Sequence, residues 1–167
     1  MSKKSYTVYI NSNDKMPGNK NNNATYQINW NDFIDRKYNS YKIRWNFTSS
    51  ASLYVDAGIV YTSAVVYVDF FGKTYSFDTT TKSASSCLGY IHRDSTKTVF
   101  NYFTCSHTEN CPKTIDRPTQ NFITIRVINT DDGITPLTET DTNGVPQSDM
   151  SSYFMCIEFE PVEGSEI

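Results

Sequence analysis

The residue types that most readily bind a metal are gathered in the segment Cys105-Ser-His107-Thr-Glu-Asn-Cys111, with Cys87 and His92 upstream. A structural zinc takes four Cys or His ligands in a tetrahedron, usually supplied as two closely spaced pairs. The spacings Cys-x-His and His-x3-Cys are unusual for such a site, and Cys87 would have to fold in as the fourth ligand. Ordinary thiols, or a crosslink between Cys105 and Cys111, explain the segment more simply. We therefore predict no metal site and keep only four weak zinc candidates: Cys87, Cys105, His107 and Cys111.

The sequence carries no recognisable catalytic group. A nucleophilic Ser or Cys needs a base within reach, and His92 and His107 are the two histidines of the chain. Neither lies in a known signature, and Gly-x-Ser-x-Gly, Walker, Gly-x-Gly-x-x-Gly and His-Glu-x-x-His motifs do not occur. A cysteine hydrolase built from His107 with Cys105 or Cys111 is the enzymatic alternative. We predict no enzyme, no catalytic residue and no bound cofactor.

Two other ligand classes fit parts of the sequence. Asp131-Asp132-Gly133 and Asp141-Thr-Asn143-Gly144 could offer oxygen atoms to calcium, but they lack the spacing of an EF-hand and suit ordinary turns. Exposed aromatic rings could stack on sugars. Trp30 and Trp45, however, fall on the apolar faces of predicted strands, so we expect both in the core.

The elements that must position these residues are strands. The chain has only three leucines, Leu53, Leu88 and Leu137, against 20 Thr, 13 Ile, 12 Tyr, 10 Phe and 10 Val. Leucine favours helices, whereas β-branched and aromatic side chains pack best on a pleated surface. This composition predicts an all-β protein whose core is rich in aromatic rings.

Alternation of apolar and polar residues predicts about eight strands. The clearest places four apolar residues (Tyr41, Ile43, Trp45 and Phe47) opposite four polar ones (Lys42, Arg44, Asn46 and Thr48). The predicted strands are residues 5–11, 26–30, 41–48, 60–70, 74–78, a split region at 88–92 and 99–103, 121–129 and 153–160. One helical turn is expected within 31–38, with Asp32 as its cap.

The connections between these strands point to a particular sandwich. Residues 60–70 and 74–78 form a predicted hairpin through Gly72, whereas the other connections are long, above all the polar loops 11–23 and 130–152. One tight hairpin is typical of a jelly roll, and an immunoglobulin-like sandwich would contain several. We predict a single eight-stranded antiparallel jelly-roll domain over residues 1–167, with a short basic arm at 1–4 and an acidic tail at 161–167.

Charge and hydropathy exclude several kinds of partner. A formal charge of −3 and a pI near 5.3 argue against binding to nucleic acid. No run of 18 apolar residues occurs, so no membrane span is expected. The first residues lack the hydrophobic segment of a secretory leader, so we expect the four cysteines to be thiols, with Cys156 an inert one in the last strand.

Several segments together resemble one family. They are the opening Ser-Tyr-Thr-Val-Tyr-Ile-Asn-Ser-Asn-Asp, then Ala-Thr-Tyr-Gln-Ile-Asn-Trp, Tyr-Lys-Ile-Arg-Trp-Asn-Phe, Phe-Phe-Gly-Lys-Thr-Tyr-Ser-Phe-Asp-Thr, and the closing Gly-Val-Pro-Gln-Ser-Asp-Met and Ile-Glu-Phe-Glu-Pro. The pattern is similar to the single jelly-roll penton and minor capsid proteins of large icosahedral DNA viruses of eukaryotes, and of their virophage and polinton-like relatives. The resemblance extends over nearly the whole chain.

The resemblance implies a structural protein of the virion, assembled in the infected host cell. It would form a homo-oligomer, as a pentamer at each vertex. Alternatively, it would bind between copies of the major capsid protein and other capsid proteins and hold them together. The chain is shorter than many vertex proteins and shows no added outer domain, which leaves penton and minor capsid positions both open. We expect the loops 11–23 and 130–152 and both termini to make the contacts. One alternative is a jelly-roll carbohydrate-binding module, which would be favoured by sugar binding that Tyr54→Ala or Trp30→Ala abolishes. The other is a trimeric ligand like tumour necrosis factor.

Overall fold

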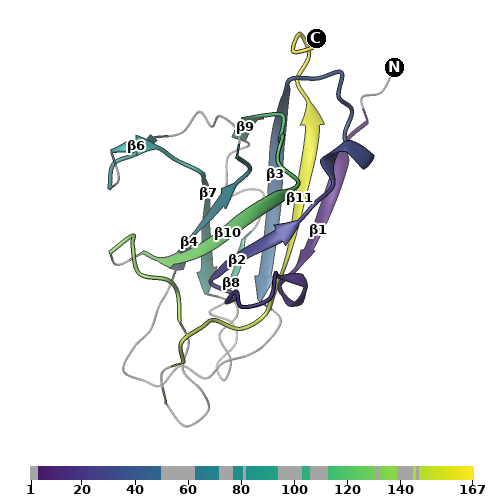
Figure 1. Cartoon of the computed structure of the whole chain (residues 1–167). Coiled ribbons are helices and arrows are strands. Elements are labelled where there is room, and N and C mark those ends of the chain that lie inside the picture. The colour runs from purple at the N-terminus through teal and green to yellow at the C-terminus, as the bar shows by residue number, and fades with distance from the viewer. Residues whose placement is uncertain are drawn as a thin grey trace.

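The computed structural model describes residues 4–49, 63–71, 77–80, 82–93, 103–105, 113–130, 132–138, 145 and 147–167 (Figure 1). Nearly all regular structure in these ranges is β. The strands are β1 (Tyr6–Asn11), β2 (Asn23–Gln27), β3 (Ser40–Ser49), β4 (Ser63–Asp69), β5 (Phe77–Asp78), β6 (Ser83–Ala84), β7 (Cys87–Arg93), β8 (Phe103–Cys105), β9 (Lys113–Asp116), β10 (Phe122–Asn129) and β11 (Tyr153–Pro161). Two short 3-10 helices, η1 (Ser12–Asp14) and η2 (Trp30–Asp32), complete the described elements.

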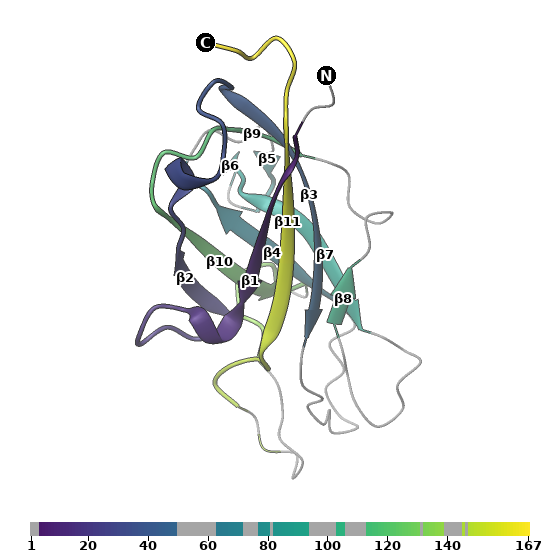
Figure 2. The same cartoon turned by 90° about the vertical axis from the view of Figure 1, so that its right-hand side faces the viewer.

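Two four-stranded antiparallel sheets face each other as a sandwich, which confirms the all-β prediction (Figure 2). The first sheet has the order β1-β11-β3, and β8 and β9 share the fourth position by pairing with different parts of β3. The second sheet has the order β2-β10-β4-β7. Strand β8 also pairs with β7, so the two sheets are joined along that side, while β1 and β2 lie at the opposite edges.

The core lies between the sheets and is filled by the faces that alternation predicted. Tyr41, Ile43, Trp45 and Phe47 of β3 are each at most 2% exposed. The polar residues between them are half-buried or exposed on the outer face. The facing sheet contributes branched aliphatic side chains that are fully buried: Val66, Val68, Ile123, Ile125 and Val127. Rings from one sheet therefore pack on β-branched side chains from the other, as this composition favours.

The chain leaves the second predicted strand earlier than expected. β2 ends at Gln27, and Trp30 begins the turn η2 instead of extending the strand. The predicted helical turn within 31–38 is therefore misplaced, and Asn29, not Asp32, occupies its N-cap position. The physical reason is the Trp30 ring, which is 2% exposed and packs edge-on against Phe159 of β11 with centroids 5.3 Å apart. Burying this ring turns the chain over the end of the core.

The predicted hairpin through Gly72 is wrong. β4 hydrogen-bonds to β10 on one side and β7 on the other, so neither of its edges is available to the residues that follow it. β5 pairs instead with β6, and the two form an arm that projects from the sandwich (Figure 1). Phe77 of this arm is 69% exposed, so its apolar character does not mark a core strand. Gly72 itself lies outside the described residues.

The composition of segment 130–152 predicted a loop, but part of this segment pairs with a strand. Residues 135–137 pair with the end of β10 through the bridge Ile128–Pro136 and the hydrogen bond from Leu137 N to Val127 O, 2.9 Å. They continue the edge position that β2 leaves after its pairing of Asn23 with Arg126. Leu137 is fully buried there. One of the three leucines thus anchors the start of this segment to the core.

A buried hydrogen bond crosses the core between the sheets. The hydroxyls of Tyr26 in β2 and Tyr153 in β11 lie 2.8 Å apart, and both side chains are at most 4% exposed. The backbone N–H of Tyr153 donates to Ser12 Oγ at 2.9 Å. Each phenol thus satisfies the other where water cannot reach, which removes the cost of burying an unpaired hydroxyl.

Removing both hydroxyls of this pair should destabilise the fold by less than the sum of the two single removals. We expect Tyr26→Phe or Tyr153→Phe to lower the free energy of unfolding by about 1–3 kcal/mol, because each leaves a buried hydroxyl without its partner. The double variant should lose less than the sum of the two single losses. Urea denaturation of the four proteins measures this coupling. Tyr9→Phe, at an exposed ring, is the control and should change little; purely additive losses would contradict the assignment.

The same pair makes the fold sensitive to alkali. Burial raises the pKa of Tyr26 to about 12 and also raises the pKa of Tyr153, whereas an unfolded tyrosine titrates near 10. Above about pH 10 the unfolded chain releases protons that the folded chain retains, so the free energy of unfolding falls as pH rises towards 12. Urea midpoints measured from about pH 9 to about pH 11 should decrease. The slope should be shallower in Tyr26→Phe/Tyr153→Phe, and equal slopes would contradict this cause.

Candidate functional site

Two of the four weak zinc candidates lie on neighbouring strands. Cys87 is the first residue of β7, and Cys105, whose side chain is not described, is the last residue of β8. The register pairs His92 with Thr104, which places Cys105 opposite Ile91, four residues from Cys87. At about 3.3 Å per residue this separation is roughly 13 Å along the strand, too long for two ligands of one zinc. His107 and Cys111 lie outside the described residues, and the described ones contain no cluster of three or more metal-binding side chains.

The two cysteines whose side chains are described, Cys87 and Cys156, are half-buried thiols. Burial raises the pKa of the Cys87 thiol, and burial together with the Glu158 carboxylate raises the pKa of the Cys156 thiol. A raised pKa lowers the thiolate fraction and with it the reactivity of the sulfur. Cys156 lies on the outer face of β11, between Tyr9 and Asn46 in the register, and its chemistry fits the inert thiol that the sequence suggested.

The residues considered for calcium and for sugar stacking have structural roles where they are described. Both Asp132 carboxylate oxygens accept hydrogen bonds within its own turn, from the Thr135 hydroxyl and from the backbone N–H groups of Ile134 and Thr135. These donors hold the pKa of Asp132 at about 2. Trp30 and Trp45 are each 2% exposed, so they belong to the core as predicted and cannot present a stacking surface. Residues 131, 141–144 and 54 lie outside the described residues.

An exposed aromatic patch lies on the outer face of the first sheet. Tyr9 of β1 and Phe154 of β11 stack with centroids 6.1 Å apart and planes at 29°, although they are 68% and 41% exposed. We call this pair the Tyr9–Phe154 patch. Farther along the same face Arg44 and Glu160 form an ion pair of 3.1 Å at the surface. A single exposed apolar residue is common on protein surfaces, whereas two stacked exposed rings are more typical of a contact surface.

The patch adjoins an open strand edge. Within the described part of the chain β1 pairs with β11 alone, so its other row of backbone N–H and C=O groups faces outward. Such an edge is a template for pairing with another chain unless charge, proline or a bulge blocks it. The strand Tyr6–Asn11 contains neither charge nor proline. Thr7 and Tyr9, on the outer face of this strand, are both exposed.

The two loops expected to make contacts are joined to each other by one carboxylate. Asp149 accepts backbone hydrogen bonds from Asn21 at 2.7 Å and from Asn22 at 2.9 Å. The Asn22 side chain, 3% exposed, donates to Leu137 O at 2.9 Å, and the Asn21 side chain donates to Met150 O at 3.0 Å. The described parts of loops 11–23 and 130–152 therefore form one surface at the end of the sandwich, stabilised by charge-assisted hydrogen bonds.

The acidic C-terminal segment is also bound to the fold. After β11 the chain runs beside the residues that lead into β3, with Asn39 N donating to Ser165 O at 2.8 Å and Ile167 N donating to Lys37 O at 2.9 Å. Glu163 and Glu166 are exposed on this segment. β1 begins and β11 ends at the same end of the molecule, opposite the joined loops (Figures 1 and 2).

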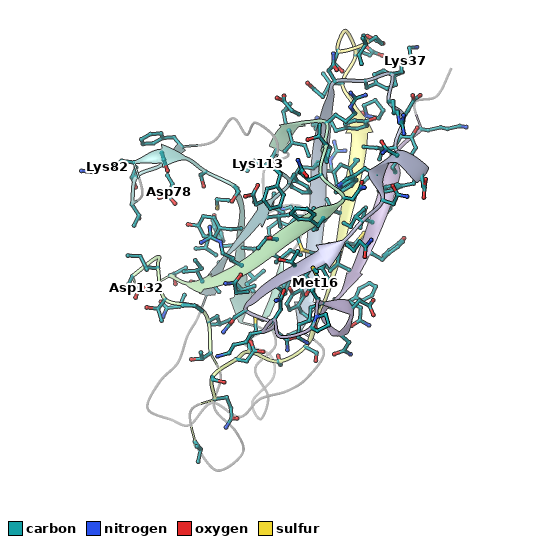
Figure 3. All side chains as sticks on the ribbon, in the orientation of Figure 1. Met16, Lys37, Asp78, Lys82, Lys113 and Asp132 are labelled. Carbon is teal, nitrogen blue, oxygen red and sulfur yellow. The ribbon has the colours of Figure 1, made fainter. Side chains whose placement is uncertain are left out.

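A cavity that the sequence did not reveal lies on the outer face of the second sheet. It measures about 220 Å³, is open to solvent on one side, and is lined by β4, β10, the β5–β6 arm, the link from this arm to β7 and the turn around Gly133. Figure 3 shows the arm, at Asp78 and Lys82, and the turn, at Asp132, projecting from the same side of the sandwich. The signal was hidden because the lining residues are spread from position 67 to position 134.

No protein-family model, curated protein or solved structure matches this chain. Among the described residues no helix is long and apolar enough to cross a membrane.

Removing the carboxylate that joins the loops should loosen them. We expect Asp149→Ala to lower the free energy of unfolding by about 1–3 kcal/mol, because two buried or half-buried N–H groups lose a charged acceptor. Urea denaturation measures the loss, and limited proteolysis should show faster cleavage within 130–152. Ser148→Ala, which changes an exposed neighbouring side chain, is the matched control. Equal stability of the two variants would mean that Asp149 does not hold the loops.

Proposed function

We propose that this protein is a single jelly-roll structural component of a virion, a penton or minor capsid protein that works by self-assembly. The observation that carries the proposal is the strand order. If β8 and β9 count as one strand and the β5–β6 arm as an insertion, eight strands remain. The first, eighth, third and sixth of these build one sheet, and the second, seventh, fourth and fifth build the other. This arrangement is the one expected of a jelly roll.

The outer surface supports an assembly role. The Tyr9–Phe154 patch offers apolar area, and the edge of β1 beside it, which pairs with no described strand, offers backbone N–H and C=O groups. A ring closes when one patch of a subunit meets a different patch of the next copy. We propose that the patch and the β1 edge form one side of such a contact. A shared fold alone does not fix a function, so the resemblance of the segments to capsid proteins is the second support.

The proposal assigns the remaining surfaces to neighbouring capsid proteins. The described parts of the joined loops 11–23 and 130–152 lie at one end of the sandwich, and the start of β1 and the end of β11 lie at the other. One end would face the major capsid protein and the other the outside or inside of the shell. This predicts a protein found in the virion after assembly in the infected cell.

Self-association provides the direct test. We expect native mass spectrometry and negative-stain imaging of the full chain to show closed rings, with five copies for a penton. Tyr9→Asp should shift the population to smaller species, because a charge would be buried in the contact. Tyr9→Phe keeps the ring and should assemble like the unchanged protein.

Two outcomes would contradict the proposal. A chain that stays monomeric at high concentration and also in the presence of capsid partners would remove its basis. Rings of three would favour the trimeric-ligand alternative. Unchanged assembly of Tyr9→Asp would leave the ring intact but show that the Tyr9–Phe154 patch is not its contact.

A further inference from the structure

The cavity between the β5–β6 arm and the outer face of the second sheet has the composition of a ligand site. Its volume of about 220 Å³ lies below the roughly 300–1,000 Å³ of pockets for drug-sized molecules, so it suits a ligand of one ring. Its polar lining comes from both walls: Tyr67 and Arg126 on the sheet, Asp78 and Ser83 on the arm, and Ser85 and Ser86 in the link from the arm to β7.

The polar groups are held in place before any ligand arrives. The Tyr67 hydroxyl donates to Asp78 Oδ2 at 3.1 Å, which ties the arm to the sheet. The guanidinium of Arg126 lies over the Tyr67 ring, 5.0 Å from its centroid, and this cation–π contact orients its donors. Burial and the Asp78 carboxylate raise the pKa of Tyr67 to about 12, so its phenol keeps its proton at neutral pH. Groups fixed in this way lower the cost of ordering a bound ligand.

The described lining does not favour an anion over a neutral ligand. Among the lining residues that the structure describes, one cation, Arg126, is matched by one anion, Asp78. Arg126 offers donors, and Asp78, whose two oxygens already accept from the Tyr67 hydroxyl and from Thr80 N, has further lone pairs that can accept. The hydroxyls of Ser83 and Ser86 can donate and accept. A ligand that matches this set must itself donate and accept around its rim, as adjacent sugar hydroxyls do.

The remaining wall is apolar. Ile128 is 5% exposed and Ile134 is 68% exposed, and both line the same cavity. A sugar ring presents C–H groups on its faces and hydroxyls at its edge, so it can cover these isoleucines while its rim meets the polar groups. A phosphate or carboxylate has no apolar face to place there.

We propose that this cavity binds one neutral sugar residue, through hydrogen bonds from Arg126 and to Asp78 and with its apolar face on Ile128 and Ile134. The site lies on the second sheet, away from the Tyr9–Phe154 patch on the first. It therefore does not depend on the proposed assembly function, and either can fail without the other.

The test is a two-dimensional NMR titration of the full, isotopically labelled chain. The probes are the methyl glycosides of glucose, galactose and mannose at millimolar concentrations, with inorganic phosphate in a separate arm. We expect at least one glycoside to give saturable shifts at the amides of Ser86, Arg126 and Gly133. Arg126→Met should weaken that glycoside at least about tenfold, since a hydrogen bond from a charged donor is lost. Arg44→Met, on the outer face of the other sheet, should leave the affinity unchanged.

Several results would contradict a sugar site in this cavity. Absence of saturation by all three glycosides, or shifts confined to other residues, would overturn the site. Binding that Arg126→Met leaves intact would overturn the assigned contacts. Saturation by phosphate at the same amides without any glycoside would overturn the ligand class. The amide spectrum of Arg126→Met reports whether the variant is folded, so a loss of binding is read only on a native spectrum.

Discussion

Large rings of the first sheet fill the space between the sheets together with branched aliphatic side chains of the second, and tyrosine rings bring hydroxyls into that space. These hydroxyls need partners away from water. Tyr26 and Tyr153 satisfy each other across the core, and the Tyr41 hydroxyl donates to Asp35 O at the opposite end. The need of each buried hydroxyl for a hydrogen-bond partner therefore determines more than how the rings pack. It holds β2 against β11 and places the turn after η2, so the ends of the sandwich depend on the polar atoms of an otherwise apolar core.

The outer faces follow a different rule from the inner ones. Inside, apolar residues are buried almost completely, whereas outside, the first sheet carries stacked exposed rings and the second carries a polar cavity. Neither outer feature contributes much to the core. A surface that retains exposed rings, an open edge and a pre-ordered set of hydrogen-bonding groups is better explained by binding than by stability. We propose that one face contacts sister copies and the other a small ligand.

Residue periodicity predicted the inner face of β3 correctly, because one buried side per strand leaves a clear alternation in Tyr41–Phe47. It failed at Trp30 and at Gly72. Trp30 keeps the alternation of β2 but lies in a turn, since burial alone cannot distinguish a strand from a turn over the core. At Gly72 the glycine suggested a hairpin, but pairing was decided by β7 and β10, which are distant in sequence. The cavity was invisible for the same reason, since its walls meet only after the sheets have formed.

Strands β1 and β11 are antiparallel neighbours, so the chain enters and leaves the sandwich at the same end. The first and last strands share one register, from Tyr6 opposite Phe159 to Asn11 opposite Phe154. The start of β1 and the end of β11 thus lie on one side (Figures 1 and 2). A short linker could connect them without crossing the sandwich, which is the geometry that circular permutation requires. A tag or fused domain at either end would also leave the Asp149-bound loops unobstructed, so the protein could be displayed on a support with those loops outward.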